Sequence, residues 1–160
     1  MKQSALLFAI LLLTACASSN DGFVDQSSHG CAPGNPVEVE AGLDMPAGID
    51  SFGNTATAHV QLSNNSDDDV TVKSIRVDPR INAQVRYQLD NGYLDVNQVL
   101  KEAESEQYEI PLTVRRNSPT MADDPRRTDG RTTSADLAVT VVLSNGEAYR
   151  CQFRVPVPLF

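Results

Sequence analysis

The two histidines, His29 and His59, are the first candidates for catalysis, because hydrolytic enzymes hold a nucleophile beside a base and an orienting group. His29 lies in a polar segment without a strand pattern, and His59 lies mid-strand on the polar side. The chain has no Gly-x-Ser-x-Gly motif and no glycine-rich phosphate loop. We therefore interpret both as surface histidines and expect no enzymatic activity, although carboxylates such as Asp68 and Glu109 leave open an enzyme that works through carboxylates.

Two groups of residues could bind metal ions. Soft ligands suit Cu(I), and the chain offers His29, His59, Cys31 and Met45. None of these shows ligand spacing such as Cys-x-x-Cys. Asn65-x-Asp67-x-Asp69 resembles the start of a calcium loop, but the following Gly and the distal Glu of an EF-hand are missing. We therefore expect a solvated turn there, and no metal or cofactor.

The segment from Arg115 to Arg131 concentrates positive charge. It holds five of the ten arginines of the chain, namely Arg115, Arg116, Arg126, Arg127 and Arg131. It is long for a loop in a compact domain, and such loops are often functional or disordered. Arginine forks pair well with carboxylate and phosphate groups. Two interpretations stay open: a contact for an anionic partner, or a plain mobile loop.

The N-terminus has the order of parts of an export signal. Met1-Lys2 precedes an apolar run of about nine residues from Ala5 to Leu13, whereas a bilayer-spanning helix needs about 20. A positive start, a short apolar core and a small-residue cleavage site form a secretory signal peptide. We therefore assign residues 1–15 to a signal that is removed after export.

The end of this signal, Leu13-Thr14-Ala15-Cys16, resembles the lipobox of bacterial lipoproteins: aliphatic, small, small, Cys. The resemblance covers residues 1 to about 18. It implies that the Cys16 sulfur receives a diacylglycerol, that the chain is cut before Cys16, and that the new amine is acylated. Three acyl chains exceed the two signals that stable anchoring usually needs. Ala17 and Ser18 follow, and the absence of Asp there is similar to lipoproteins sorted to the outer membrane. An ordinary secretory signal that ends near a Cys is the alternative.

Cys31 and Cys151 are the cysteines left over once Cys16 is assigned to the lipid. Two spare thiols in an exported chain favour one disulfide, because the periplasm is oxidising. Closing a loop of this length stabilises the fold by about 4–5 kcal/mol in the chain-entropy model. The alternative is a pair of free thiols in a metal site, which would lack nearby histidine partners.

The charge balance is acidic, with 21 Asp and Glu against 13 Lys and Arg. Nonspecific nucleic-acid binding depends on basic residues that neutralise phosphates, so we expect no nucleic-acid partner. Negative charge also repels anionic lipid headgroups. We therefore expect the membrane link to be the lipid rather than a charged face.

The mature chain divides into a short tether and one domain. Residues 16–30 comprise the lipidated Cys16 and a polar, small-residue stretch that is typical of a flexible tether, with a root-mean-square reach of roughly 20 Å. From Val37 onward, apolar residues alternate with polar ones at period two, which is typical of half-buried strands. Residues 31–160 are therefore predicted to form a β-domain.

The pattern also predicts where strands end. A phase slip at Lys73-Ser74 indicates a bulge, and Asp78-Pro79 should stop that strand. Ile81 to Leu89 alternate up to Asp90-Asn91-Gly92, a tight-turn signal, with Leu94 and Val96 in a short partner strand. Val96 to Glu106 could form one or two helical turns. Leu137–Leu143 and Tyr149–Val155, joined by Asn145-Gly146, form the clearest predicted hairpin.

Seven or eight short strands predict an antiparallel, immunoglobulin-like β-sandwich. Tyr149-Arg150-Cys151 resembles the immunoglobulin Tyr-x-Cys corner, but we discount it, since the chain has no Trp and Cys151 lies in the last strand. The leading hypothesis for function is a lipid-anchored, non-enzymatic binding or assembly module on the periplasmic side of the outer membrane, with an envelope protein as partner. The alternative is a metal- or small-ligand-binding periplasmic lipoprotein.

Overall fold

A computed structural model describes residues 31, 34–45, 55–81, 87–116 and 132–158 of the chain. Every regular element within these ranges is a β-strand. These ranges contain no helix long and apolar enough to cross a membrane. The eight strands are β1 (Val37–Asp44), β2 (Thr55–Asn64), β3 (Val70–Ile81), β4 (Tyr87–Leu89), β5 (Gly92–Leu100), β6 (Ser105–Arg116), β7 (Thr132–Leu143) and β8 (Ala148–Pro158).

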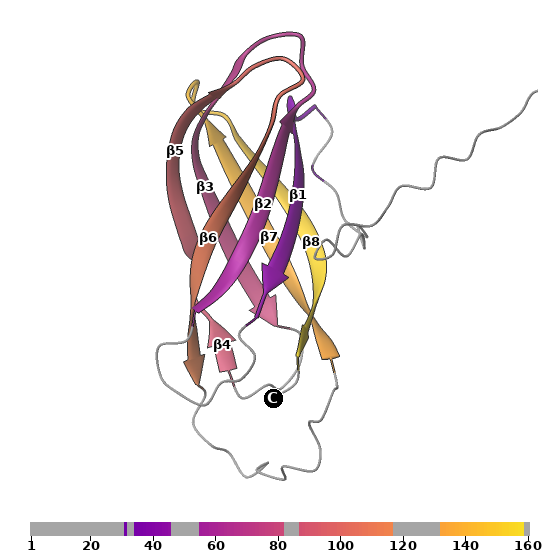
Figure 1. Cartoon of the computed structure of the whole chain (residues 1–160), viewed down its shortest axis with the longest axis vertical. Coiled ribbons are helices and arrows are strands. Elements are labelled where there is room, and N and C mark those ends of the chain that lie inside the picture. Colours follow the sequence, from indigo (N-terminus) through magenta and orange to yellow (C-terminus); the bar gives the residue numbers. More distant parts are fainter. Residues whose placement is uncertain (1–30, 32–33, 46–54, 82–86, 117–131, 159–160) are drawn as a thin grey trace, which may run out of the picture.

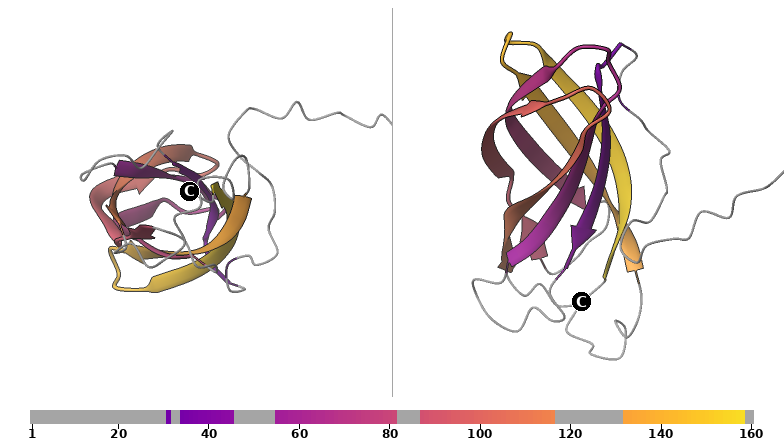
Figure 2. Two further views of the ribbon diagram at one scale, coloured as in Figure 1. Left: turned by 90° about the horizontal axis from the view of Figure 1, so that it is seen from below. Right: turned by 45° about the horizontal axis from the view of Figure 1, so that its top comes forward.

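The strands form two four-stranded sheets that face each other (Figure 1). The first sheet has the order β1-β2-β6-β4, and the second has the order β5-β3-β7-β8. All pairings between these strands are antiparallel. Seen from below, the two curved layers enclose the region that the core side chains fill (Figure 2). The predicted antiparallel β-sandwich of seven to eight strands is confirmed.

The core is built from the alternating positions that the sequence singled out. Along β2, Ala56, Ala58, Val60 and Leu62 are fully buried, while the residues between them point outward. Successive side chains of a strand point to opposite faces, so one face of each strand becomes core. The largest fully buried aliphatic side chains are Leu62, Ile75, Leu100, Ile110, Leu112 and Leu137.

The predicted bulge in β3 is confirmed. The register of β3 with both of its neighbours shifts between Val72 and Ser74. Ser74 and Ile75 are both buried, which breaks the strict alternation at that point. On the neighbouring edge strand β5, Asn97 adopts a positive φ of 50° within the same stretch. Irregularities of this kind increase local twist and make an edge strand a poorer template for aggregation.

The prediction that Asp78-Pro79 ends a strand is wrong. β3 continues to Ile81, with Pro79 opposite Leu137 of β7. β5 pairs with β3 only as far as Val77, so β3 has one described neighbour at the proline. Proline is tolerated in such an edge position because no second ladder needs its missing N–H. Residues 82–86 of the predicted strand Ile81–Leu89 lie outside the described ranges, and β4 is its described end.

The predicted hairpin at Asp90-Asn91-Gly92 is also wrong. β4, before this segment, pairs with β6, whereas β5, after it, pairs with β3. The segment therefore carries the chain from the first sheet to the second (Figure 1). The amide of Asp90 still donates to the carbonyl oxygen of Thr113 at 2.9 Å. The backbone pairing of β4 with β6 thus extends by one residue, to Asp90, before the chain passes to the second sheet.

The helical turns considered for Val96 to Glu106 are not formed. β5 runs on to the buried Leu100, and β6 begins at Ser105 after a tight turn in which the amide of Glu104 donates to the carbonyl of Lys101. Burial alternates along the whole of β5, but the polar Gln98 occupies an inward position and the apolar Val99 an outward one. These two residues explain why period two could not be recognised there.

Candidate functional site

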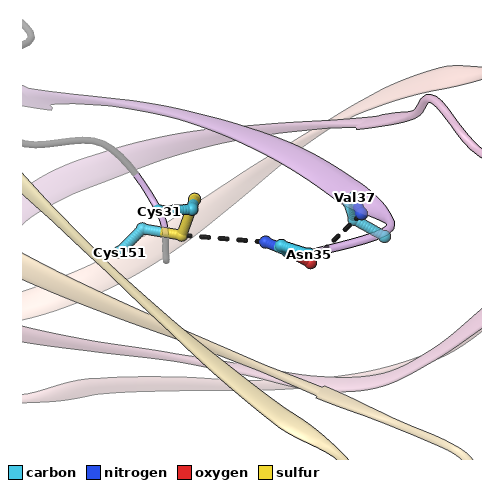
Figure 3. Close-up of a disulfide and its surroundings, with 4 residues drawn as sticks. All are labelled: Cys31, Asn35, Val37 and Cys151. Carbon is cyan, nitrogen blue, oxygen red and sulfur yellow. Dashed lines mark hydrogen bonds between the residues drawn. A yellow bond between two sulfur atoms is a disulfide. The ribbon is translucent and has the colours of Figure 1, made fainter. Parts of the chain in front are cut away.

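The junction between the N-terminal segment and the domain is a disulfide. The sulfur atoms of Cys31 and Cys151 are bonded, across a sequence separation of 120 residues (Figure 3). The two cysteines also form an isolated antiparallel bridge beside β8. The side chain of Asn35 links the disulfide to the start of β1. Its Nδ2 lies 4.0 Å from the Cys151 sulfur, and its Oδ1 accepts a hydrogen bond from the amide of Val37 at 3.1 Å. The predicted pairing of Cys31 with Cys151 is confirmed.

The disulfide determines where the preceding chain meets the domain. β8 is an edge strand of the second sheet, and Cys151 is fully buried within it. Cys31 covers part of this edge, where unpaired backbone groups would otherwise invite another strand. Cys16, His29 and the tether lie outside the described residues, but any chain that enters at Cys31 arrives beside β8.

His59 lies at the centre of a polar cluster on the outer face of the first sheet. Its Nε2 is 2.8 Å from Oδ2 of Asp44 on β1, and its Nδ1 is 4.0 Å from Oε1 of Glu109 on β6. Its side chain is 19% exposed. The predicted outward position is correct, but the expected solvated histidine is in fact mostly buried and hydrogen-bonded to Asp44. This cluster links three strands of the sheet.

Within the described ranges, the His59 cluster offers a base and an orienting carboxylate without a hydrogen-bonded nucleophile. The Nδ1 atom of His59 is buried and has no hydrogen-bond partner there. The carboxylates considered for catalysis lie on separate elements: Glu109 is on β6, and Asp68 is in the turn between β2 and β3. No group of three or more His, Cys, Asp or Glu in the same ranges is arranged to hold a metal ion.

The turn that resembles a calcium loop is organised by Asn64, which the sequence analysis missed. Its Nδ2 donates to the carbonyl oxygens of Asp68 at 2.8 Å and Leu100 at 3.0 Å. Its Oδ1 accepts from the amide of Ser66 at 3.0 Å and from the Ser66 hydroxyl at 2.7 Å. The available signal was an Asn at the end of an alternating strand, where such side chains form turns with their own backbone. The turn joins β2 to β3 and hence one sheet to the other.

The arginine segment is described only at its beginning. Arg115 donates from Nε to Oδ2 of Asp90 at 2.5 Å, and its side chain is 70% exposed. Arg116 ends β6, in register with Tyr87. Arg126, Arg127 and Arg131 lie outside the described residues. The structure therefore places Arg115 against the sheet crossing at Asp90.

The sequence analysis discounted an immunoglobulin-type corner at Tyr149, and the side chain of Tyr149 has a different role. Its hydroxyl donates to Oε2 of Glu147, two residues upstream, at 2.8 Å. This hydrogen bond raises the pKa of Tyr149 and lowers the pKa of Glu147. The side chain of Asn145 also contacts Glu147, at 2.9 Å. The contact stays within the β7–β8 turn region and joins no second element.

Two large apolar side chains are well exposed, and both lie on β5. Tyr93 is 58% exposed and Val99 is 47% exposed. The hydroxyl of Tyr93 donates to Oδ1 of Asp95 at 2.6 Å. Both positions point away from the core, on the outer face of the second sheet. The sequence analysis placed Leu94 and Val96 in a short strand but did not single out the residues between and beside them.

Comparison with known proteins yields fold neighbours only. No family model matches the chain, and no curated protein matches it. Northeast Structural Genomics Consortium target SoR45 is 11% identical over 78% of this chain and 86% of that chain, with a TM-score of 0.45. A Bordetella pertussis protein, target BeR40 of the same consortium, is 16% identical over 78% and 89%, with a TM-score of 0.38. Likenesses at this level carry no argument about activity.

Proposed function

We propose that this protein is a lipid-anchored component of the bacterial cell envelope that acts as a non-enzymatic binding or assembly module in the periplasm. The disulfide between Cys31 and Cys151 is the observation that carries the proposal. Disulfides persist in oxidising compartments, whereas cytosolic thiols are kept reduced. A disulfide-closed sandwich directly after a lipobox-type signal therefore supports export, with acylated Cys16 as the anchor.

The architecture supports a role as a rigid module. Both sheets contribute to one continuous apolar core, and the disulfide ties the start of the domain to its last strand. Such a body presents fixed outer faces close to the membrane. The partner contact in this proposal is the segment from Arg115 to Arg131, because Arg115 keeps most of its side chain exposed while Asp90 orients it.

Lipid attachment can be tested in the native cell. The mature protein is expected to begin at Cys16, to carry diacylglycerol and an N-linked acyl chain in mass spectra, and to fractionate with the outer membrane. The Cys16→Ser variant should lose the acyl groups and should no longer fractionate with the outer membrane. An intact, unlipidated N-terminus on the wild-type protein would refute the anchor.

The partner contact can be tested by crosslinking intact envelopes and isolating the protein. The wild-type chain should return a reproducible envelope protein, and Arg115→Ala combined with Arg126→Ala and Arg127→Ala should reduce its recovery. Lys101→Ala is the matched control, since Lys101 is exposed in the turn between β5 and β6, away from this segment. Failure to recover any reproducible partner would contradict the assembly role.

A further inference from the structure

The outward-facing charged residues of the described strands are unequally distributed between the two faces of the sandwich, with an excess of acidic residues on one and of basic residues on the other. The outer face of the first sheet carries the acidic residues Glu38, Glu40, Asp44 and Glu109, with Arg115 near the end of β6. The outer face of the second sheet carries the basic residues Lys73, Arg76, Arg80, Arg150 and Arg154, with Asp78, Asp95 and Asp136 among them. The expectation that the protein repels anionic headgroups assumed evenly distributed charge, which is not what the fold produces.

Strand register gathers four of these arginines into one patch. Arg76 and Arg150 lie on either side of Thr140, and Arg80 and Arg154 lie on either side of Asp136. β3 and β8 flank β7, so facing arginines are about 10 Å apart at the backbone. Along each strand, the two arginines are four residues apart, or roughly 13 Å. The patch therefore matches a surface of spaced negative charges rather than a single small anion.

The patch retains positive charge after its internal ion pairs are counted. Arg76 donates from Nε to Asp78 at 2.8 Å, and Arg154 donates from Nε to Asp136 at 2.9 Å. Within the described part of the chain, Arg80 and Arg150 have no ion pair. Their guanidinium groups are exposed and can pair with phosphate oxygens.

An exposed aromatic residue borders the patch. Tyr93 on the edge strand β5 lies opposite Arg76 and is 58% exposed. Tyrosine is enriched where protein meets the boundary between headgroups and hydrocarbon, because its ring is apolar and its hydroxyl is polar. The same face thus combines arginines for phosphates with an aromatic side chain suited to the interface.

The chain before the domain joins it beside this face. Cys31 is bonded to Cys151, the neighbour of Arg150 on β8. Only residues 17–30 separate Cys31 from Cys16, so the chain between the two cysteines spans at most about 50 Å when fully extended. The anchor is therefore attached beside β8, an edge strand of the basic sheet, at a point where β1, an edge strand of the acidic sheet, also begins.

We propose that the outer face of the β5-β3-β7-β8 sheet lies against the anionic phospholipid headgroups of the bilayer that holds Cys16; this rests on the lipid anchor of the proposed function. The acidic face points away from the membrane, beyond a second sheet about 10 Å distant. At physiological salt the Debye length is about 8 Å, so that face adds little repulsion. Docking fixes which surface of the module faces the periplasm.

Tryptophan fluorescence can test the orientation, because the chain contains no Trp. The lipidated full-length protein would be reconstituted into vesicles of phosphatidylcholine with phosphatidylglycerol, with bromine atoms near the headgroup end of the acyl chains. Tyr93→Trp places the probe on the basic face, and Gln61→Trp places a matched probe on the outer face of β2. Bromine quenches a Trp only at close range.

The Tyr93→Trp emission should be quenched, and the Gln61→Trp emission should not. Quenching should disappear in pure phosphatidylcholine, at high salt, and when Arg76→Gln, Arg80→Gln, Arg150→Gln and Arg154→Gln are added. Unchanged circular dichroism of that charge variant shows that it is folded. If the protein floats with the vesicles but Tyr93→Trp is not quenched, the docking is overturned and the anchor is not. The basic face would then be assigned to the binding of an acidic protein. Protein that carries no lipid and does not float overturns the anchor and the docking with it.

Discussion

Gly92 and Leu112 touch at the point where the chain crosses between the sheets. A Cβ atom placed on Gly92 would lie 2.5 Å from Cδ2 of Leu112 and 2.6 Å from Cγ2 of Ile110. Gly92 is buried, and both neighbours are fully buried on β6. The sequence pattern Asp-Asn-Gly indicated a turn, but the glycine is needed here because the backbone of β5 approaches the side chains of β6.

Gly92→Ala is therefore expected to destabilise the domain. Overpacking a closed core typically costs 1–3 kcal/mol, and we expect a loss of about 2 kcal/mol in the free energy of unfolding. Urea denaturation followed by circular dichroism measures it. Asn91→Ala, at the exposed neighbouring position, should change stability by less than about 0.5 kcal/mol. Equal effects of the two variants would mean that the site is not tightly packed.

Asn64→Leu should destabilise the domain because it removes buried hydrogen bonds, although the volume of the side chain hardly changes. The substitution keeps a similar volume but removes the donors to the carbonyl oxygens of Asp68 and Leu100. Leaving a buried acceptor unpaired costs about 1–3 kcal/mol, so a loss of at least about 2 kcal/mol is expected. The exposed neighbour, Asn65, makes a side-chain contact with Glu38 and serves as the control through Asn65→Ala, which should be nearly neutral in thermal unfolding.

Reduction of the Cys31–Cys151 disulfide should lower the unfolding free energy by up to about 4–5 kcal/mol, since the bond closes a long loop in the unfolded chain. The comparison is the denaturation midpoint with and without reductant. The double variant Cys31→Ser, Cys151→Ser should match the reduced wild type and should not respond to reductant. An identical midpoint for oxidised and reduced wild type would argue against any role of the bond in stability.

Stability should fall in alkaline solution because of Tyr87. Burial raises its pKa from 10.0 to about 12. The folded state then holds the phenolic proton more tightly than the unfolded state, so the contribution is complete below pH 10 and is lost as the pH rises through about 12. At 1.36 kcal/mol per unit, the full loss is about 3 kcal/mol. Denaturation series between these pH values should show it, and Tyr87→Phe should flatten the slope.

Local patterns in the sequence were sufficient for the fold class. Period two in segments such as Ala58 to Leu62 indicates which side chains enter the core, because side chains alternate along any strand whatever its neighbours are. The β7–β8 hairpin is also a local feature: Asn145-Gly146 supplies the turn, and Gly146 adopts the positive φ of 88° that glycine permits. The lipobox at Cys16 depends on sequence alone.

Periodicity does not specify which strand lies beside which. The pattern was the same whether Asp90–Gly92 closed a hairpin or crossed between sheets, because a turn signal records backbone shape rather than strand pairing. The contact of His59 with Asp44 and the role of Asn64 depended on residues brought together by that pairing.

The chain's own order of residues determined that it forms strands, which faces are apolar, and that two cysteines are available to pair. Only the assembled sandwich decided which charges share a face. Net charge is a sum over the whole chain, whereas the separation of Arg76 and Arg150 from Glu40 and Glu109 arises from strand order in two different sheets. That order is set by long-range packing between segments far apart in the chain, which no local pattern records.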